Sequence, residues 1–211
     1  MLTLTLTGCS SGPGPEPEAA DASGPRVIQP GKPGEAAAEV APDEASVPDS
    51  EWNHTDVAFM QMMIPHHAQA IDMAELVPER AGSDVVRRLA ERIKAAQGPE
   101  ILTMAAWLAD RGLEVPKVGD DMSDFDHGKH GHHSMTGMLS EAQLERLASA
   151  RGTEFDRLFL TGMIQHHRGA ISMANDASPE VGDVLVSELV ADVNASQSAE
   201  INRMRDLLAA L

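Results

Sequence analysis

Residues 56–74 read DVAFMQMMIPHHAQAIDMA, and residues 156–174 read DRLFLTGMIQHHRGAISMA. The two stretches align at an offset of 100 residues without a gap, and each contains two adjacent histidines set among methionines. Ten of their nineteen positions are identical: Asp56/Asp156, Phe59/Phe159, Met63/Met163, Ile64/Ile164, His66/His166, His67/His167, Ala70/Ala170, Ile71/Ile171, Met73/Met173 and Ala74/Ala174.

The same offset continues along the chain. Further matches follow without a gap: Leu89/Leu189, Gln97/Gln197, Glu100/Glu200, Ile101/Ile201 and Met104/Met204. Chance does not keep one register over roughly fifty residues, so the pattern indicates an internal duplication.

Apolar residues recur at spacings of four and three in each copy, which is typical of one face of an α-helix. In the first copy this stripe consists of Phe59, Met63, His66, Ala70 and Met73. Because neighbouring residues on a helix lie about 100° apart, His67 is expected to point away from His66. The first helix of the first copy is predicted to have its N-cap at Asn53 or Thr55, and the short helix before the second copy to open at Ser140. A second helix follows in each copy, with N-caps at Ser83 and Asp183.

Two helical hairpins with one apolar face each bury those faces by packing together. The sequence therefore predicts an all-α fold, a ferritin-like four-helix bundle made of two duplicated αα-hairpins. Repeat one is placed at residues 53–112 and repeat two at 153–211. Between them we expect a long central crossover loop, rich in His and Met, at residues 113–139 and a short helix at 140–151.

The first fifty residues have a different composition from the rest of the chain. Residues 6–9 read LTGC and resemble a bacterial lipoprotein cleavage site, at which Cys9 would be lipidated. This signal, residues 1–9, is truncated, because it lacks a basic segment and a full apolar segment. Residues 10–50 hold eight of the thirteen prolines and no apolar period. They are predicted to be a disordered acidic linker.

Charge and cysteine content exclude several classes of function. The net charge of -17 argues against nucleic-acid binding and favours cations as ligands. With a single cysteine, the chain has neither an internal disulfide nor a thiolate-clustered zinc or iron–sulfur site. Any metal ligands must therefore be His, Met or carboxylate.

The central loop is the second concentration of candidate ligands. Residues 114–138 read EVPKVGDDMSDFDHGKHGHHSMTGM and show no helical period. Imidazole suits copper, nickel and zinc, and thioether favours Cu(I), so the loop reads as a metal-capturing tract. The alternative is a solvated loop with chance histidines. The candidate ligands here are His127, His130, His132, His133, Met135 and Met138.

In the bundle, the duplicated histidine pairs are the candidate metal ligands, with four methionines as candidate thioethers. A buried imidazole must be hydrogen-bonded or ligated. For His66 and His166 the alternative is therefore a core histidine bonded to Glu100 or Glu200. The ligand candidates are His66, His67, His166, His167, Met63, Met73, Met163 and Met173. The residues expected to support them are Gln97, Glu100, Gln197, Glu200, Asp56 and Asp156.

Histidine with methionine and no thiolate fits copper, as Cu(I) or Cu(II), better than iron or zinc. Ferritin-type di-iron sites use several inward glutamates with Glu-x-x-His motifs. Glu51-x-x-His54 has that spacing, but its counterpart, Arg151-x-x-Glu154, does not.

The doubled F-x₃-M-I-x-H-H-x₂-A-I-x-M-A pattern, each followed by Q-x₂-E-I-x₂-M, resembles a bacterial secreted family catalogued as domain of unknown function 305. The resemblance covers about residues 53–211. It implies a ferritin-like bundle of two repeats of two helices, export from the cytoplasm and an association with copper binding. It implies no settled activity.

These observations favour an extracytoplasmic copper-binding protein that sequesters or buffers the ion. It would be secreted or held at the membrane through a lipid anchor only. A copper- or iron-dependent oxidase working in the bundle core ranks second, because no acid, base or substrate pocket is evident. The third reading is a structural or interaction module without metal, with protein partners unknown.

Overall fold

A computed structural model gives the structure of this chain and describes residues 25–29, 36–45, 51–117 and 135–211. The chain divides into two units, Met1–Asp49 and Ser50–Leu211. In the first unit, strands β1 (Val27–Gln29) and β2 (Ala38–Val40) pair antiparallel, with Val27 opposite Val40. The sequence analysis did not predict this short hairpin. Cys9 and the proposed signal lie outside the described residues.

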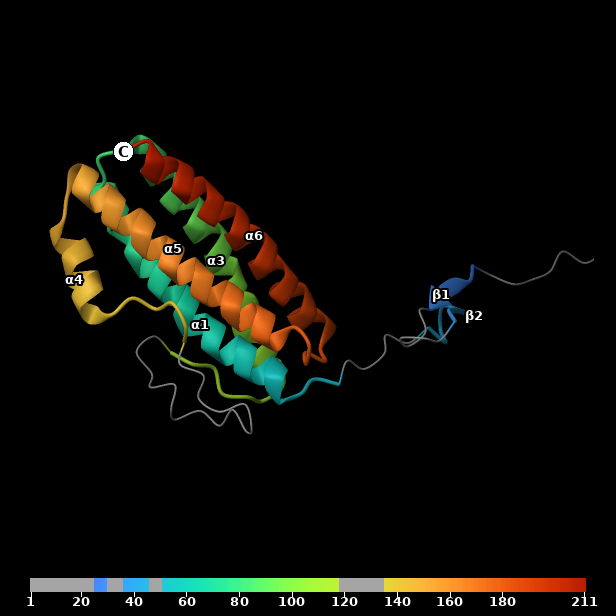
Figure 1. The fold of residues 1–211 in the computed structure, drawn as a ribbon. Coiled ribbons are helices and arrows are strands. Elements are labelled where there is room, and N and C mark those ends of the chain that lie inside the picture. Colours follow the sequence, from blue (N-terminus) through green and yellow to red (C-terminus); the bar gives the residue numbers. More distant parts are fainter. Residues whose placement is uncertain (1–24, 30–35, 46–50, 118–134) are drawn as a thin grey trace, which may run out of the picture. The chain divides into compact units, whose positions relative to one another are not determined.

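The second unit is an all-α bundle of four long helices (Figure 1). They are α1 (His54–Glu75), α3 (Asp84–Asp110), α5 (Gly152–Ala177) and α6 (Val184–Ala209). Two shorter helices, α2 (Val77–Arg80) and α4 (Glu141–Ser149), lie in the connections. Helix α1 packs most extensively on α3 and α5 on α6, while α1 and α5 join the two hairpins. None of the described helices has the length and apolar character that a membrane span requires.

The helix ends follow the predicted caps. Asn53 starts α1 with a capping box, its side chain accepting from the backbone N–H groups of Thr55 and Asp56. Ser83 caps α3, Ser140 caps α4 and Asp183 caps α6. These side chains provide acceptors for N–H groups that have no partner within the helix.

Two apolar clusters fill the bundle, one on each side of its middle. One contains Met73 at the C-terminal end of α1 and Phe159 near the start of α5. The other contains Phe59 near the start of α1 and Met173 towards the end of α5. Helices α1 and α5 therefore run antiparallel, as Figure 1 shows. Their midpoints, which carry the histidine pairs, meet between the two clusters.

Candidate metal centre

His66 and His166 form the middle of the bundle. Both side chains are fully buried, and their ring centroids lie 3.8 Å apart with the planes tilted by 40°. The His166 Nε2 lies 2.8 Å from the His66 carbonyl oxygen, and the His66 Nε2 lies 3.1 Å from that of Thr136. A carbonyl oxygen can only accept, so each ring carries its proton on Nε2. The Nδ1 atom of each ring therefore presents its lone pair.

His67 and His167 lie beside this pair, and each is bound to a glutamate. The Nε2 atoms donate to Oε2 of Glu100 and Glu200 at 2.6 Å in both copies. The rings are fully buried, while the glutamate side chains remain 22% and 21% exposed. The sequence analysis had considered these glutamates as partners of His66 and His166. They bind instead the neighbouring histidine of each pair.

Hydrogen bonds reach only one nitrogen of each of the four rings. In the described part of the chain, eleven buried side-chain N or O atoms have no hydrogen-bond partner. Eight of these are the four Nδ1 atoms of the histidine pairs and the amide atoms of Gln97 and Gln197. Leaving a polar group buried and unpaired costs about 1–3 kcal/mol. Most of the buried polar atoms without a partner therefore belong to histidines and glutamines that occur in both copies of the repeat.

Burial also keeps the inner pair neutral. Burial, and after it the neighbouring His67, lower the pKa of His66 to about 3. The pKa of His166 lies well below 6.5 for the same reasons, with burial first and the neighbouring His66 second. Both rings are therefore neutral at physiological pH, with Nε2 protonated and Nδ1 not, which is the state in which imidazole binds metal.

A short segment, residues 135–139, crosses the helices over the inner pair, and we call it the strap. The Gln69 amide exchanges two hydrogen bonds with the backbone of Leu139, and Gln165 donates to the carbonyls of Gly137 and Met138. The strap touches α5 at Gly169, where an added Cβ would lie 1.7 Å from the Thr136 oxygen. This close approach holds the Thr136 carbonyl within hydrogen-bonding distance of the His66 ring.

The four candidate methionines are buried and flank the histidines in two groups. Met63 and Met173 belong to one apolar cluster, and Met73 and Met163 belong to the other. A further duplicated methionine from a partner helix joins each cluster, Met104 from α3 and Met204 from α6 respectively. The sequence analysis noted the duplication of these last two but did not treat them as possible ligands.

Asp56 and Asp156, expected near the centre, lie elsewhere. Ten residues separate Asp56 from His66, which is about 15 Å along a helix. The Asp56 carboxylate accepts from the backbone N–H groups of Gly182 and Asp183 at the start of α6. Asp156 accepts from the backbone N–H groups of Gly82 and Ser83 at the start of α3. Each aspartate thus caps a helix of the other hairpin, and we call this pair the crossed caps.

The central loop is described only at its ends. Met135 and Met138 are half-buried in the strap, whereas His127, His130, His132 and His133 lie outside the described residues. Within residues 51–117 and 135–211, no three His, Cys, Asp or Glu side chains gather as a metal-holding group. The candidate ligands in this part of the chain are imidazole and thioether groups, and such a set suits soft ions such as Cu(I).

Residues 56–208 match the family model described as domain of unknown function (DUF305). No curated protein matches the chain. A DUF305 protein from Streptomyces coelicolor, thought to be secreted, is 33% identical, with a TM-score of 0.64 over 74% of this chain and 93% of that one. A DUF305 fragment from Deinococcus radiodurans is 31% identical, with a TM-score of 0.65 over 76% of this chain and 99% of the fragment.

CopM was solved in a Cu(II)-bound form, and this structure is 34% identical to the chain. The TM-score is 0.60, over 74% of this chain and 96% of CopM. CopM was also solved in Cu(I)-bound, Ag-bound and apo forms, which are similar to the chain too.

Proposed function

Since the chain belongs to the DUF305 family, we propose that it binds copper outside the cytoplasm and buffers or sequesters the ion. CopM, solved with Cu(I), Cu(II) and Ag, supports metal binding by this chain. The observation that carries the proposal is the set of four buried imidazoles. Each has its Nε2 hydrogen-bonded and its Nδ1 without a partner among the described residues.

This arrangement is the one that metal-binding histidines use. A ligating imidazole commonly donates its other ring N–H to a carboxylate or a backbone carbonyl, which fixes the tautomer and the ring orientation. Here Glu100 and Glu200 are the carboxylates, while Thr136 and His66 supply the carbonyls. We expect the Nδ1 atoms of His66, His67, His166 and His167 to be the nitrogen ligands.

The methionine groups on both sides make copper the preferred ion, because thioether sulfur selects Cu(I) over harder cations. The lone pairs of His66 and His166 lie in their ring planes, so an ion would bind at the ring edges rather than between the stacked faces. We propose Met63, Met73, Met163 and Met173 as the thioether ligands. Iron and zinc rank below copper on the same argument.

Buffering suits this centre better than catalysis. The four rings are fully buried, and the strap covers the inner pair, so a bound ion would be shielded from solvent. We propose that the histidines and methionines of the central loop collect metal. We also propose that Cys9 carries a lipid anchor, or that the chain is secreted. The similarity to a DUF305 protein thought to be secreted supports an extracytoplasmic location.

Anaerobic titration of the full chain, without a histidine tag, tests the proposal with Cu(I) and a chromogenic chelator in competition. We expect the variant H66L/H166L to lose the Cu(I) bound in the core, because leucine fills the space without a lone pair. E100Q/E200Q should retain the ligands and lower the affinity by about 10–100-fold. His54→Leu, an exposed residue at the start of α1, is the matched control.

The thioether part is tested with leucine substitutions that keep the side-chain size. M63L/M163L should weaken Cu(I) binding, whereas M60L should leave it unchanged, because the second copy already carries Leu160 at that position. If H66L/H166L, with native helix content, binds as much Cu(I) as the parent and as tightly, the bundle core is not the site. Loss of binding only in H127A/H130A/H132A/H133A would place the site in the central loop.

A further inference from the structure

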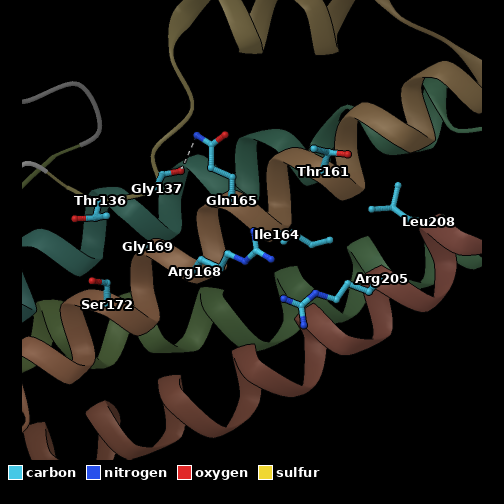
Figure 2. Close-up of a pocket in the computed structure, with 10 residues that line it drawn as sticks. All are labelled: Thr136, Gly137, Thr161, Ile164, Gln165, Arg168, Gly169, Ser172, Arg205 and Leu208. Atoms are coloured by element: carbon cyan, nitrogen blue, oxygen red, sulfur yellow. Dashed lines mark hydrogen bonds between the residues drawn. The ribbon is translucent and has the colours of Figure 1, made fainter.

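A groove of about 740 Å³ lies along α5, and none of the metal ligands proposed above lines it. It is bounded by the strap at Thr136 and Gly137 and by the C-terminal part of α6. Figure 2 shows the Arg168 and Arg205 guanidinium groups entering this space from α5 and α6. The hydroxyl groups of Thr161 and Ser172 come from the same face of α5.

The charge of the groove is opposite to that of the protein. The chain has 33 acidic and 16 basic residues, yet two arginines and no carboxylate line this groove. Within the described residues, Arg168 makes no hydrogen bond or ion pair. Arg205 has only a long contact of 3.4 Å, from its Nη1 to Asn202. Two unneutralised cations therefore face one cavity.

The two arginines occur together in one copy of the duplication. The equivalent positions in the first copy are Ala68 and Ala105, so both cations are specific to the second copy. The strap, which closes one end of the groove, also occurs once in the chain. Arginines that only keep a helix surface soluble have no reason to lie at one groove, whereas Arg168 and Arg205 do.

We propose that this groove binds a small oxyanion with two or more negative charges, such as a di- or tricarboxylate or a phosphorylated metabolite. Each guanidinium can hold a carboxylate or phosphate with two parallel N–H···O bonds. The hydroxyl of either Thr161 or Ser172, which lie about 16 Å apart along α5, could add a further donor. The volume lies in the range of about 300–1,000 Å³ of small-molecule pockets. The inference does not depend on the metal proposal.

Titration of the full, metal-free chain with citrate, and separately with inorganic phosphate, tests this site by ¹H–¹⁵N NMR and calorimetry. We expect citrate to shift the amides of residues 136–137, 161–172 and 205–208 in a saturable way. R168Q/R205Q should weaken citrate binding by at least about tenfold, since two charged contacts are lost. Phosphate should bind more weakly than citrate, because it carries fewer negative charges at neutral pH.

The matched control is R157Q, which removes an exposed arginine of α5 that does not line the groove. It lowers the net charge by the same amount per residue and should leave citrate binding unchanged. Vesicles of phosphatidylglycerol provide a third arm, which tells a lipid headgroup from a soluble ligand. Equal citrate binding by the parent and R168Q/R205Q, or no saturable shifts with any of the three oxyanion probes, would overturn the proposal.

Discussion

His67 and His167 occupy matching places in α1 and α5, and each donates to its glutamate at 2.6 Å. The inner histidines, at equally matching places, have different partners. His66 donates to the Thr136 carbonyl of the strap, whereas His166 donates to the carbonyl of His66 itself. The hydrogen bond between histidine and glutamate, which joins two side chains of the same copy, therefore occurs in both copies. Contacts made by a segment that occurs once do not.

Surface charge differs between the copies in the same way. Arg92 and Arg203 line a small hollow together with Glu200. The equivalent positions around Glu100 carry Asp192 and Thr103. The duplication thus provides a frame with near-twofold symmetry, and the residues that break this symmetry lie around the histidine centre. Four experiments on metal-free protein test how far the two copies are equivalent.

The largest effect is expected at the crossed caps, where the copies differ in the number of contacts. Asp56 accepts from three backbone N–H groups, those of Asn53, Gly182 and Asp183. D56A should lower the free energy of unfolding by about 3–5 kcal/mol, since each unpaired buried donor costs about 1–3 kcal/mol. D156A should cost less, about 2–4 kcal/mol, because Asp156 accepts from two backbone N–H groups, those of Gly82 and Ser83. Urea denaturation measures both, and equal losses would mean that the caps are equivalent.

Gly169→Ala should dislodge the strap, because the new Cβ would collide with the Thr136 carbonyl. We expect a loss of about 2 kcal/mol from the displaced contacts. The ¹⁵N resonances of the His66 ring should change, while those of His166 stay as they are. Gln69→Ala, which removes two hydrogen bonds to the strap without a collision, should give a smaller loss. Equal changes at both rings would show that the strap does not distinguish them.

The inner pair should make stability depend on pH. In the folded chain the pKa of His66 is about 3 and that of His166 is well below 6.5. Below pH 6.5 these two histidines therefore bind protons in the unfolded chain but not in the folded chain. Stability should therefore be full above pH 6.5 and fall with decreasing pH, by at most about 1.4 kcal/mol per pH unit for each ring. Unfolding midpoints between pH 7.5 and 5.5 measure this slope.

The matched variants H66L and H166L should each flatten that slope by a similar amount, and the double variant should flatten it most. A slope identical to that of the parent in the double variant would show that the inner histidines are not the groups that titrate on unfolding.

The smallest effect is expected where the copies carry Gly98 and Ser198. An added Cβ at Gly98 meets nothing within 4 Å, and the residue lies inside α3. Gly98→Ala should stabilise the fold by about 0.5–1 kcal/mol, because alanine loses less backbone entropy in a helix. Thermal unfolding checks the sign, and a loss of stability would show that α3 needs glycine at this point.

The helices and their ends could be read from the sequence, because local rules decide them. Asn53, Ser83 and Asp183 are N-caps as predicted, and the stripe through Met63, His66 and Met73 is buried. The duplication also placed the two histidine pairs at the same depth in the bundle, which the antiparallel contact of α1 with α5 explains.

The partners of the histidines could not be read in this way. A helical stripe assumes solvent on the opposite face, yet α1 is buried around most of its circumference by α3, α5 and the strap. His67 is consequently as deeply buried as His66, and it is His67 that reaches Glu100. The strap comes from a loop without periodicity. The local sequence therefore could not predict that Thr136 is the partner of His66.

The crossed caps have a consequence for how the chain folds. The backbone N–H groups of Gly182 and Asp183, just before α6, donate to Asp56 on α1. The N–H group of Gly82, just before α3, donates to Asp156 on α5. Neither half can complete its own backbone hydrogen bonding before the other arrives, so assembly should be cooperative and unfolding a single transition. A chain cut within the central loop should accordingly remain a tight complex of two fragments, neither of which is stable alone.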